Sequence, residues 1–445
     1  MSLLRIATAL ALISAAACKS AIPPKETPVN PPAGRASGPN YQADVNDYAK
    51  KQFDRGREIF RDETFGSEEF WSDKLQLDKA ILGAKQGGVG SGLSPKAALA
   101  AGLKVDANRL PESVAEGIKD GRVNLDNPAS TVALLKANAV VGVHAFFKGD
   151  KVASIGITCA ICHSTVDSAS GIGSRRDGWP NRDLNVGAIV SLAANLKVLA
   201  DLLGVDEPTV RKVLASWGPG KYDAELDVDG KAFRPDGKPA ATLIPAAFGL
   251  AGVNLHTYTG WGTVTYWNAY VAITQMHGKG TFFDPRLDDR QKFPIAARAR
   301  LGHTRSDDDQ VTDKLAALHI YQLTIPAPQP PSDSYDRQAA QRGKALFEGK
   351  AKCATCHVPP LYAEPGRPMH SAQEIGIDDF QAQRSPDGMY RTTPLKGLFT
   401  RSKGGFYHDG RFADLAAVIA HYERVLRLRL TSAERADLQE FLKSL

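Results

Sequence analysis

Two short motifs in this 445-residue sequence combine paired thiols with an imidazole. Each reads Cys-x-x-Cys-His; the first runs from Cys159 to His163 and the second from Cys353 to His357. On a helical turn, thiols at positions i and i+3 share one face, so both can bond to the vinyl groups of one porphyrin. The histidine that follows then projects its imidazole toward the iron. This spacing is the attachment signature of c-type haem.

Two other chemistries use paired cysteines. A thioredoxin-like redox site needs neither the adjoining histidine nor a second copy, and no βαβ pattern surrounds either motif. A shared zinc site would place its two pairs about 12–20 residues apart, whereas nearly two hundred residues separate these. We therefore expect two covalently bound haem c groups. Their attachment residues and proximal iron ligands are Cys159, Cys162, Cys353, Cys356, His163 and His357.

The composition is that of a soluble globular protein, with 43% hydrophobic and 23% charged residues. It excludes a disordered chain, a collagen-like chain and a polytopic membrane protein. The formal net charge of +6 is small for this length, and no basic stripe stands out, so we expect no nucleic-acid partner. The sequence has no Walker loop, no His-Glu-x-x-His and no Gly-x-Ser-x-Gly, which leaves hydrolase and nucleotide-binding functions without support.

The N-terminus has the pattern of an export signal. Arg5 precedes an apolar run at residues 6–13 and small residues at 14–17, so the predicted signal peptide covers residues 1–18. The apolar run is shorter than the ~20 residues that span a bilayer. Because haem is attached in an oxidising compartment, we expect the protein in the periplasm.

Cys18 is the one cysteine outside the two haem motifs. Its setting resembles a bacterial lipobox, in which the cysteine becomes the lipidated first residue, although Ala15 stands where leucine is usual. In the alternative, cleavage falls nearby and Cys18 leaves with the peptide. The proline-rich stretch at 19–40 is predicted to be an extended tether. A lipid on Cys18 would be the only connection to the membrane.

A short repeat sets the domain organisation. Residues 55–60 read Arg-Gly-Arg-Glu-Ile-Phe and residues 342–347 read Arg-Gly-Lys-Ala-Leu-Phe. We interpret each as the first helix of a cytochrome c-type domain, in which the glycine permits a close approach and the phenylalanine packs beside the haem. The proline-rich segment 326–331 separates the two domains. A capping box at 431–434 begins a C-terminal helix.

The predicted fold class is therefore all-α, with two cytochrome c-type haem domains. The first domain covers residues 41–325 and is elaborated by a large helical insertion at about 61–150. The second domain covers residues 332–445. We find no sustained alternation of apolar and polar residues of the kind that predicts strands.

Two stretches of the second domain carry a specific pattern: Tyr390–Gly397 (Tyr-Arg-Thr-Thr-Pro-Leu-Lys-Gly) and Phe406–Arg411 (Phe-Tyr-His-Asp-Gly-Arg). Together they resemble the bacterial di-haem cytochrome c peroxidase and MauG superfamily. The resemblance is specific over 340–445, weaker over 150–190, and not found over 61–150. It implies that one haem transfers electrons while the other meets an oxidant.

The sequence departs from this family in its axial ligands. Family peroxidases have a second histidine shortly after the first motif, but no histidine occurs between His163 and His256. They also have a methionine before the last helix, where Tyr422 stands here; MauG-type proteins have a tyrosine ligand and an open first haem. His421 is the alternative to Tyr422 as the ligand, because dioxygenases of the superfamily use two histidines at the second haem. The candidate distal ligands of the second haem are Tyr422, His421, Met369 and Met389.

The resemblance implies two further features. Family members place a tryptophan between the haems as an electron relay, for which Trp267 and Trp261 are candidates; core packing is the alternative for each. Members often hold one calcium ion near the domain interface, so one calcium is a candidate cofactor. The acidic stretch 225–236 has the outline of a calcium loop, yet it lacks the first and last residues of an EF-hand. A turn built on its two Asp-Gly pairs fits it better.

Two classes of function remain. In the first, the protein is an enzyme, a peroxidase or MauG-like oxidase with a reactive first haem and an electron-transfer second haem. In the second, it is a non-catalytic di-haem electron carrier anchored at the membrane surface. The lack of a histidine after His163 favours the enzyme, because peroxide or O₂ needs an empty coordination position.

For the enzyme and for the electron carrier alike, the expected partner is a small redox protein or a quinol-linked electron donor or acceptor. The basic segment 390–430 is a candidate for haem propionate compensation or for docking an acidic partner. Arg175, Arg176 and Asp177 are candidates for orienting the oxidant.

Overall fold

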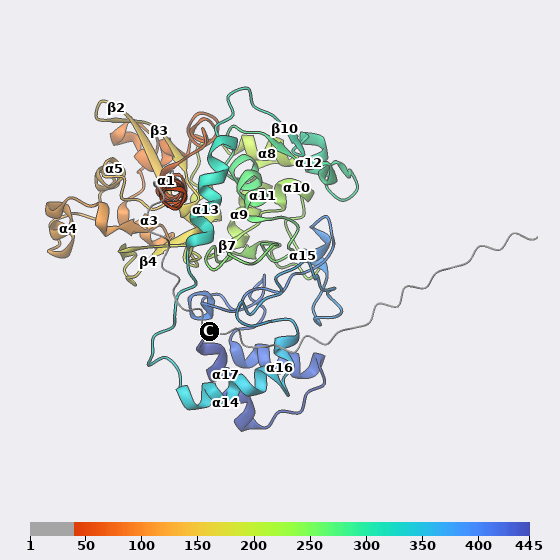
Figure 1. Ribbon diagram of the computed structural model, residues 1–445. Helices are drawn as coiled ribbons and strands as arrows, with labels where there is room; N and C mark the ends of the chain where they lie inside the picture. The colour runs from red at the N-terminus through yellow and green to blue at the C-terminus, as the bar shows by residue number, and fades with distance from the viewer. Residues whose placement is uncertain (1–39) are drawn as a thin grey trace, which may run out of the picture. The chain divides into compact units, whose positions relative to one another are not determined.

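The computed structural model describes residues 40–445. The predicted signal peptide, Cys18 and the tether up to residue 39 lie outside these residues. The described chain is mostly helical, as the predicted fold class requires (Figure 1). None of the helices within it is both long and apolar enough to cross a membrane.

Short helices and short strands alternate along the chain. The α-helices are α1 (Tyr41–Asp62), α2 (Leu77–Leu82), α3 (Pro95–Ala100), α4 (Glu112–Lys119), α5 (Pro128–Lys136), α6 (Ala160–His163), α7 (Val186–Val190), α8 (Lys197–Leu203), α9 (Glu207–Trp217), α10 (Leu226–Asp229), α11 (Val264–Tyr270), α12 (Pro294–Ala299), α13 (Leu315–Thr324), α14 (Arg337–Glu348), α15 (Phe380–Gln383), α16 (Leu415–Val425) and α17 (Ser432–Lys443). The strands are β1 (Val105–Asp106), β2 (Val143–Lys148), β3 (Lys151–Ile157), β4 (Ser164–Val166), β5 (Ile172–Gly173), β6 (Arg175–Asp177), β7 (Lys221–Tyr222), β8 (Thr242–Leu243), β9 (Phe282–Phe283) and β10 (His303–Thr304).

Two further kinds of helix occur in the described chain. The π-helices are η1 (Glu69–Lys74) and η4 (Val271–Gln275). The 3₁₀ helices are η2 (Ala84–Gln86), η3 (Ala107–Arg109), η5 (Pro285–Asp288), η6 (Thr312–Lys314), η7 (Cys353–Thr355) and η8 (Leu398–Arg401).

A β-hairpin corrects the prediction that the chain has no sustained strands. Strands β2 and β3 pair antiparallel, with Val143 opposite Ile157, and the hairpin begins within the region predicted as a helical insertion (Figure 1). Gly149 follows β2 with a positive φ of 62°, as the tight turn of a hairpin requires. The Gly-Asp pair at this turn and the β-branched residues after it were the missed signal. The other strands form two-stranded pairs of two or three residues each.

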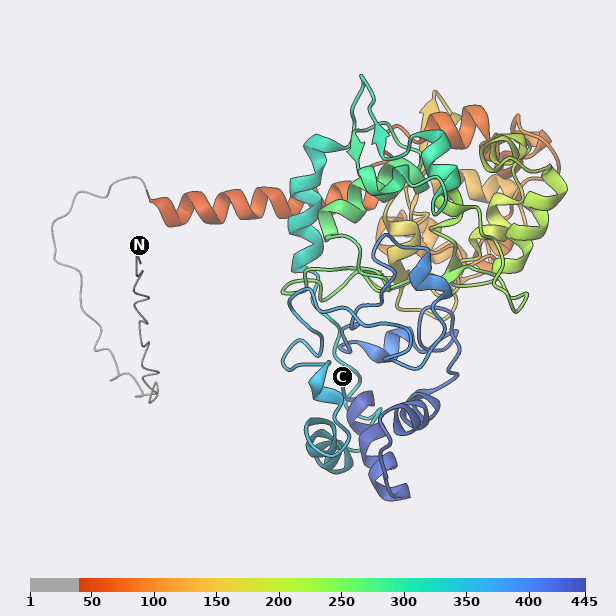
Figure 2. The same cartoon turned by 90° about the vertical axis from the view of Figure 1, so that its right-hand side faces the viewer.

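The first copy of the Arg-Gly repeat lies at a close helix crossing. A Cβ atom at Gly56 in α1 would lie 2.0 Å from the carbonyl oxygen of Ala317 in α13 and 2.7 Å from Cβ of Tyr321. Phe60, one turn later, is fully buried, and its ring centroid lies 5.6 Å from that of Tyr321. Only glycine lets the two helices approach this closely, and Figure 2 shows the crossing.

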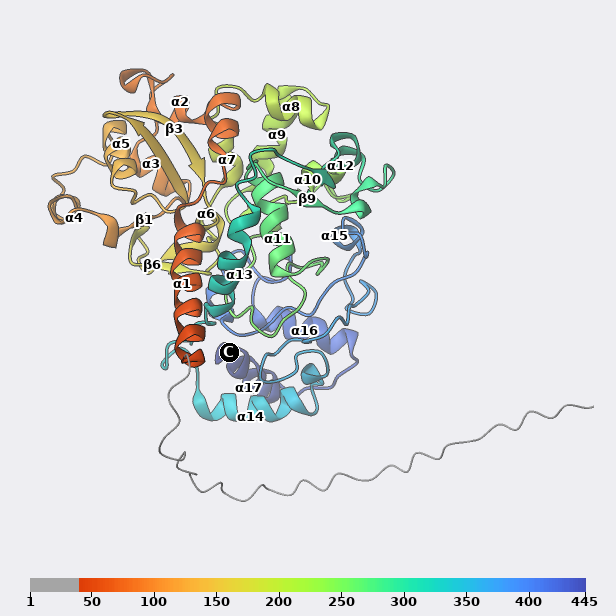
Figure 3. The ribbon, with the colours of Figure 1, turned by 45° about the horizontal axis from the view of Figure 1, so that its top comes forward.

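The second copy repeats this geometry. A Cβ atom at Gly343 in α14 would lie 2.0 Å from the carbonyl oxygen of Asp437 in α17 and 2.8 Å from Cβ of Phe441. The ring centroids of Phe347 and Phe441 are 5.1 Å apart. Helices α14 and α17 therefore lie side by side (Figures 1 and 3). The glycine of the repeat thus permits the close approach that the sequence predicts.

The buried apolar side chains form several clusters, three of which are large. One involves the β2–β3 hairpin with α7 and α9, a second involves α1, α11 and α13, and a third involves α14, α16 and α17. The first Cys-x-x-Cys-His motif lies between the first two clusters, because Ala160 belongs to one and Ile161 packs against the other. The core thus holds this motif on both sides.

We expect Gly343→Ala to weaken the protein because the added methyl meets a backbone oxygen that cannot move aside. The free energy of unfolding should fall by about 1–3 kcal/mol, as for other overpacked sites. Lys344→Ala, on the exposed face of the same helix, is the control and should change it by about 0.5 kcal/mol or less. Denaturant unfolding measures both. Equal effects of the two variants would contradict the importance of the crossing.

Candidate functional site

The first motif presents a neutral imidazole in a fixed tautomer. Nδ1 of His163 lies 3.1 Å from the carbonyl oxygen of Pro245. A carbonyl only accepts, so Nδ1 carries the proton and Nε2 is left with a free lone pair. Burial lowers the pKa of His163 to about 4 and raises the pKa of Cys159 and of Cys162 to about 12. The motif thus offers two thiols and one unprotonated nitrogen, as a haem iron ligand requires.

The second motif has the same arrangement on a different element. Cys353 begins the 3₁₀ helix η7, and Nδ1 of His357 lies 3.0 Å from the carbonyl oxygen of Tyr362. Burial lowers the pKa of His357 to about 4. The ring of Phe347 lies 6.4 Å from that of His357, centroid to centroid. Both predicted proximal histidines are therefore oriented with Nε2 available.

A cavity of about 330 Å³ adjoins the first motif, within the size range of small-molecule and cofactor sites. Its lining includes Cys159, Cys162 and His163, and its remaining walls are mostly apolar. Both π-helices contribute to these walls: η1 provides Phe70 and Trp71, and η4 provides Val271, Thr274 and Gln275. Short π-helical segments are frequent at functional sites.

Two arginines, the buried Arg401 and the half-buried Arg391, add a second argument for haem. Burial lowers the pKa of Arg391 and of Arg401 to about 10. Neither pairs with a carboxylate within residues 40–445, and Nη1 of Arg391 and Nε of Arg401 have no hydrogen-bond partner there. Arg391 also lines the cavity. Buried guanidinium groups need an anion, and the propionates of a haem have that chemistry. Thiols, imidazole, apolar walls and arginines together fit the group.

Comparison with known proteins agrees with this donor set. No protein-family model matches the chain. The methylamine utilization protein MauG of Methylorubrum extorquens is 30% identical over 154 residues, which cover 29% of this chain and 43% of that protein. The cytochrome-c peroxidase IdrP1 of Denitromonas iodatirespirans is 28% identical over 192 residues, which cover 32% and 51%.

The chain is thus similar in part to a MauG protein and to a cytochrome-c peroxidase, as its resemblance to the di-haem peroxidase and MauG superfamily implies. It spans about half the length of the curated relatives that it matches. The relationship supports the prediction of a haem-containing oxidoreductase.

Two solved structures were also aligned with the chain. A hydrazine synthase of Kuenenia stuttgartiensis is 18% identical and covers 48% of this chain and 75% of its own, with a TM-score of 0.27. The Y463M variant of the di-haem peroxidase BthA of Burkholderia thailandensis is 15% identical and covers 51% and 77%, with a TM-score of 0.32. Both scores are too low to support an argument about the fold.

The two neighbouring candidates for the distal ligand of the predicted second haem have different surroundings in the structure. Nε2 of His421 donates to the carbonyl oxygen of Ile375 at 2.8 Å. Tyr422 instead lies beside the second motif: burial raises its pKa, and the nearby Cys356 and Cys353 add to this rise. The geometry thus favours Tyr422, and the ligand assignment stays a prediction.

The two methionine candidates also lie near the second motif. Met369 and Met389 are half-buried, and the residues that follow them, His370 and Tyr390, form a β-bridge. A ring nitrogen of His370 lies within 4.8 Å of Sγ of Cys356. Both methionines therefore stay candidates.

The two candidate relay tryptophans belong to one aromatic cluster. Trp261 is 2% and Trp267 is 8% exposed, and their ring centroids lie 4.9 Å apart at 88°. Trp267 also lines the cavity. Their Nε1 atoms have no hydrogen-bond partner among residues 40–445. Both core packing and electron relay suit this arrangement, so the relay remains a prediction.

One loop conformation occurs twice in the structure, and the sequence analysis did not recognise this repeat. One copy is closed by a bridge between His256 and Gly262, and the other by a bridge between Phe406 and Phe412. Their second residues, Thr257 and Tyr407, share a positive φ of 65° and 69°. The repeated spacing Thr-Tyr-Thr-Gly and Tyr-His-Asp-Gly was the available signal.

The third residues of the two loops are Tyr258 and His408. Their rings meet edge to face, with centroids 6.1 Å apart. Tyr258 also lines the cavity, and its carbonyl oxygen accepts a hydrogen bond from the backbone nitrogen of Arg391. Tyr258 is therefore an aromatic contact from the first cavity to the Phe-Tyr-His-Asp-Gly stretch at residues 406–410, which the sequence analysis missed.

Arg175, Arg176 and Asp177 do not line the cavity. They form β6, which pairs with β4. The Asp177 carboxylate accepts hydrogen bonds from Nε of Arg61 and the hydroxyl of Tyr321, both at 2.6 Å. These contacts hold Asp177 in the scaffold beside the cavity, and the hypothesis that the three residues orient an oxidant stays a prediction.

The acidic segment near the cavity is held by an arginine from the second predicted domain. Arg384 is fully buried; its Nη1 lies 2.9 Å from Asp223 and its Nε lies 2.8 Å from Asp229. Asp236, the last acid of the calcium-like outline, instead pairs with Arg234 and Lys238. The acids of this outline thus point to different partners, and a calcium ion stays a prediction.

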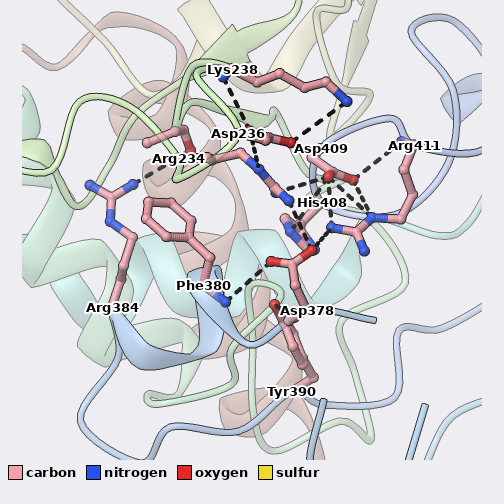
Figure 4. Close-up of polar contacts among 11 residues, drawn as sticks. Arg234, Asp236, Lys238, Asp378, Phe380, Arg384, Tyr390, His408, Asp409 and Arg411 are labelled. Atoms are coloured by element: carbon pink, nitrogen blue, oxygen red, sulfur yellow. Dashed lines mark hydrogen bonds and ion pairs between the residues drawn. The ribbon is translucent and has the colours of Figure 1, made fainter. Parts of the chain in front are cut away.

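A second ionic network joins the same two parts of the chain. Arg234 donates to Asp378 at 2.8 Å and to Asp409 at 3.0 Å, and Arg411 contacts both carboxylates (Figure 4). Burial opposes the charge of Asp378, but Arg411 and Arg234 lower its pKa to about 2. Asp378 is therefore ionised at neutral pH. This network holds the Phe-Tyr-His-Asp-Gly stretch against residue 234.

We expect Arg384→Met to destabilise the protein strongly, because it leaves Asp223 and Asp229 buried without a cation. The loss should be about 3–5 kcal/mol at pH 8. Burial already raises the pKa of Asp223 to about 6 despite Arg384, so without the arginine the folded state binds more protons than the unfolded state. Its stability then falls as the pH rises, and the loss should be smaller at pH 5.

Denaturant unfolding at the two pH values measures this loss. Lys197→Met, which removes an exposed pair with Asp201, is the control and should change stability little at either pH. An equally small loss of stability in Arg384→Met would show that the ion pairs of Arg384 with Asp223 and Asp229 do not hold the acidic segment in place.

Proposed function

We propose that this chain is an exported di-haem c-type cytochrome with enzymatic activity, a peroxidase or MauG-like oxidase. Its first haem, at His163, reacts with peroxide or O₂. Its second haem, at His357, transfers electrons. The two copies of Cys-x-x-Cys-His and the relationship to MauG and a cytochrome-c peroxidase support this function.

The proposal includes two cytochrome c-type domains, at residues 41–325 and 332–445. Its support is the pair of glycine crossings, which place Gly56 against α13 and Gly343 against α17 with matching distances. Each crossing joins the first and last long helix of its predicted domain. The insertion at 61–150 supplies η1, which forms one wall of the cavity.

The observation that carries the assignment of roles is an asymmetry between equivalent helices. The two repeated loops each lead into a helix, α11 with N-cap Thr263 and α16 with N-cap Asp414. Tyr422 lies eight residues after its cap; the residue at that place in the first copy is Val271, which lines the cavity. Valine cannot bind iron, whereas a phenolate can. The first haem would therefore lack the phenolate that the second would receive, although the imidazoles of His256 and His277 also line this cavity.

The residues of the chain would act as follows. Nε2 of His163 and Nε2 of His357 would ligate the two irons, each held by its Nδ1 hydrogen bond. Arg391 and Arg401 would bind propionates. When bound, a haem supplies an iron that exchanges electrons and, where a coordination position is open, binds an oxidant. The apolar walls would exclude water from the first site.

Electrons would pass between the sites through aromatic side chains. Trp267 and Tyr258 both line the first cavity, and Tyr258 contacts His408. His408 stacks on Tyr390, with ring centroids 5.4 Å apart. This chain of contacts leads out of the first cavity into the second domain, so Tyr258 joins Trp267 and Trp261 as a candidate relay.

The proposal also covers location and partners. We place the protein in the periplasm, with a lipid on Cys18 as its membrane anchor. The electron donor or acceptor is a small redox protein or a quinol-linked carrier. Arg424, Arg427 and Arg429 are exposed at and after the end of α16, so they would attract an acidic partner.

We expect each motif to hold its own haem covalently. Cys159→Ala combined with Cys162→Ala should halve the haem that remains on the chain after denaturation, because only the second attachment site survives. Cys353→Ala combined with Cys356→Ala is the matched variant and should also leave half. Haem staining and pyridine haemochrome absorbance measure the content. An undiminished content in either double variant would refute the attachment.

We expect Tyr422→Phe to convert the second haem from low spin to high spin, because the phenol ligand is lost. His421→Ala is the control; it removes a hydrogen bond to Ile375 and should leave the low-spin signal in place. Electron paramagnetic resonance of the ferric protein measures both. Loss of the low-spin signal in the His421 variant alone would assign the ligand to His421 instead.

A further inference from the structure

One wall of the first cavity contains buried acceptor oxygens that have no donor. Four side chains of this wall are between 2% and 8% exposed and line the cavity: Asp223, Glu225, Gln275 and Gln381. One oxygen of each has no hydrogen-bond partner among residues 40–445, namely Oδ2 of Asp223, Oε2 of Glu225 and Oε1 of both glutamines. Buried polar atoms are normally paired, so this wall lacks a molecule that donates hydrogen bonds.

The orientation of the two glutamines supports this conclusion. Nε2 of Gln275 donates to the carbonyl oxygen of Ala224 at 2.9 Å. The side chain of Gln381 forms a hydrogen bond that lowers the pKa of Glu225, so its amide nitrogen is the donor. Each amide therefore uses its nitrogen on the acidic segment and leaves Oε1 free.

The acidic segment also has more negative charge than its arginine balances. Four acids occur between residues 223 and 229, and Arg384 pairs with Asp223 and Asp229. Glu225 and Asp227 form no ion pair with any described residue. Burial raises the pKa of Glu225 to about 7 and that of Asp227 to about 8, and the neighbouring carboxyls add to both rises. A bound cation would relieve this repulsion.

Neither a haem nor a single metal ion provides what this wall lacks. The propionates of a haem at His163 are anions, which the acids would repel. Among the described residues, three side chains bring metal-ligating atoms within 4.8 Å of one another at Cys356, Glu364 and His370. The acids of the first cavity do not form such a group, so their oxygens do not converge on one ion. A molecule with several separate donors fits them better.

Aromatic side chains adjoin the acids. Tyr222 lines the cavity directly before Asp223, and Asp227 lies close enough to add to the rise in its pKa that burial causes. Trp217 also lines the cavity, with its ring centroid 5.4 Å from that of Tyr222. The faces of aromatic rings attract organic cations. The wall thus combines negative charge, free acceptors and aromatic surface.

We propose that this wall of the first cavity binds a small protonated amine, an organic cation with several N–H donors. The ammonium group would pair with the carboxylates of Glu225 and Asp227 and donate to the free oxygens of Gln275 and Gln381. Water would donate to the same oxygens but leave the negative charge unbalanced. The proposal goes beyond the proposed function, because it requires binding and no reaction at the haem.

Isothermal titration calorimetry of the haem-loaded protein with ethylammonium chloride at pH 8 tests the site. Ethylammonium should bind once per chain. Tetramethylammonium has the same charge but no N–H donor, so it should bind about tenfold more weakly or worse. No binding of ethylammonium, or equal binding of the two cations, would overturn the proposal.

Two variants test whether binding occurs at this wall. Glu225→Gln removes a charge and Gln275→Leu removes a free oxygen, so each should weaken ethylammonium binding about tenfold. Asp236→Asn removes an acid that lies outside the cavity lining and pairs with Arg234 and Lys238; it is the matched control and should bind as the wild type does. Gln275→Leu changes no charge and keeps the test valid if Glu225→Gln does not fold. Wild-type affinity in the folded cavity variants would refute the site.

Reaction of the wild type with hydrogen peroxide, measured separately, distinguishes this proposal from the proposed function. A protein that reacts with peroxide but does not bind ethylammonium would overturn the amine site alone. A protein that binds ethylammonium but does not react with peroxide would overturn the proposed function alone.

Discussion

Two glycines of the repeated Arg-Gly motif permit close helix crossings among residues 40–445. At Gly56 and at Gly343 the facing helix brings a carbonyl oxygen to a point where no side chain fits. Each crossing buries a phenylalanine one turn later, and Phe347 in turn packs near His357. Interiors are packed as densely as crystals, so a displacement at either crossing would be transmitted to the residues behind it. At the second crossing, Phe347 thus connects the helix contact to the predicted haem ligand His357.

Similar structural elements surround the two Cys-x-x-Cys-His motifs, but the two sites differ in the side chains that these elements provide. Both motifs fix their histidine by an Nδ1 hydrogen bond to a backbone carbonyl, and both repeated loops lead into a helix that faces a motif. The difference lies in what the helix offers: valine at residue 271 and tyrosine at residue 422. The first site also receives the acidic segment that Arg384 holds. One fold repeated twice can thus support a reactive and an electron-transferring site, as in the proposed function.

The sequence allowed the local chemistry to be predicted better than the long-range contacts. The Cys-x-x-Cys-His motifs and the Arg-Gly repeat are short patterns, and the structure gives the histidines and glycines the expected surroundings. The hairpin at residues 143–157 was missed because its apolar and polar residues do not alternate regularly. The roles of Arg384 and Tyr258 could not be foreseen, because their partners lie far away in the sequence. For the same reason the contact of Asp177 with Arg61 could not be foreseen, because Arg61 lies in another element.

The central claim is that the first haem has an open coordination position and the second does not. Titration of the fully reduced protein with carbon monoxide tests it most directly, because this ligand binds ferrous haem only where a position is free. The account predicts one carbon monoxide bound for every two haems, and none in the Cys159→Ala and Cys162→Ala double variant, which would lack the first haem. Binding of none by the intact protein would contradict the account and favour an electron carrier.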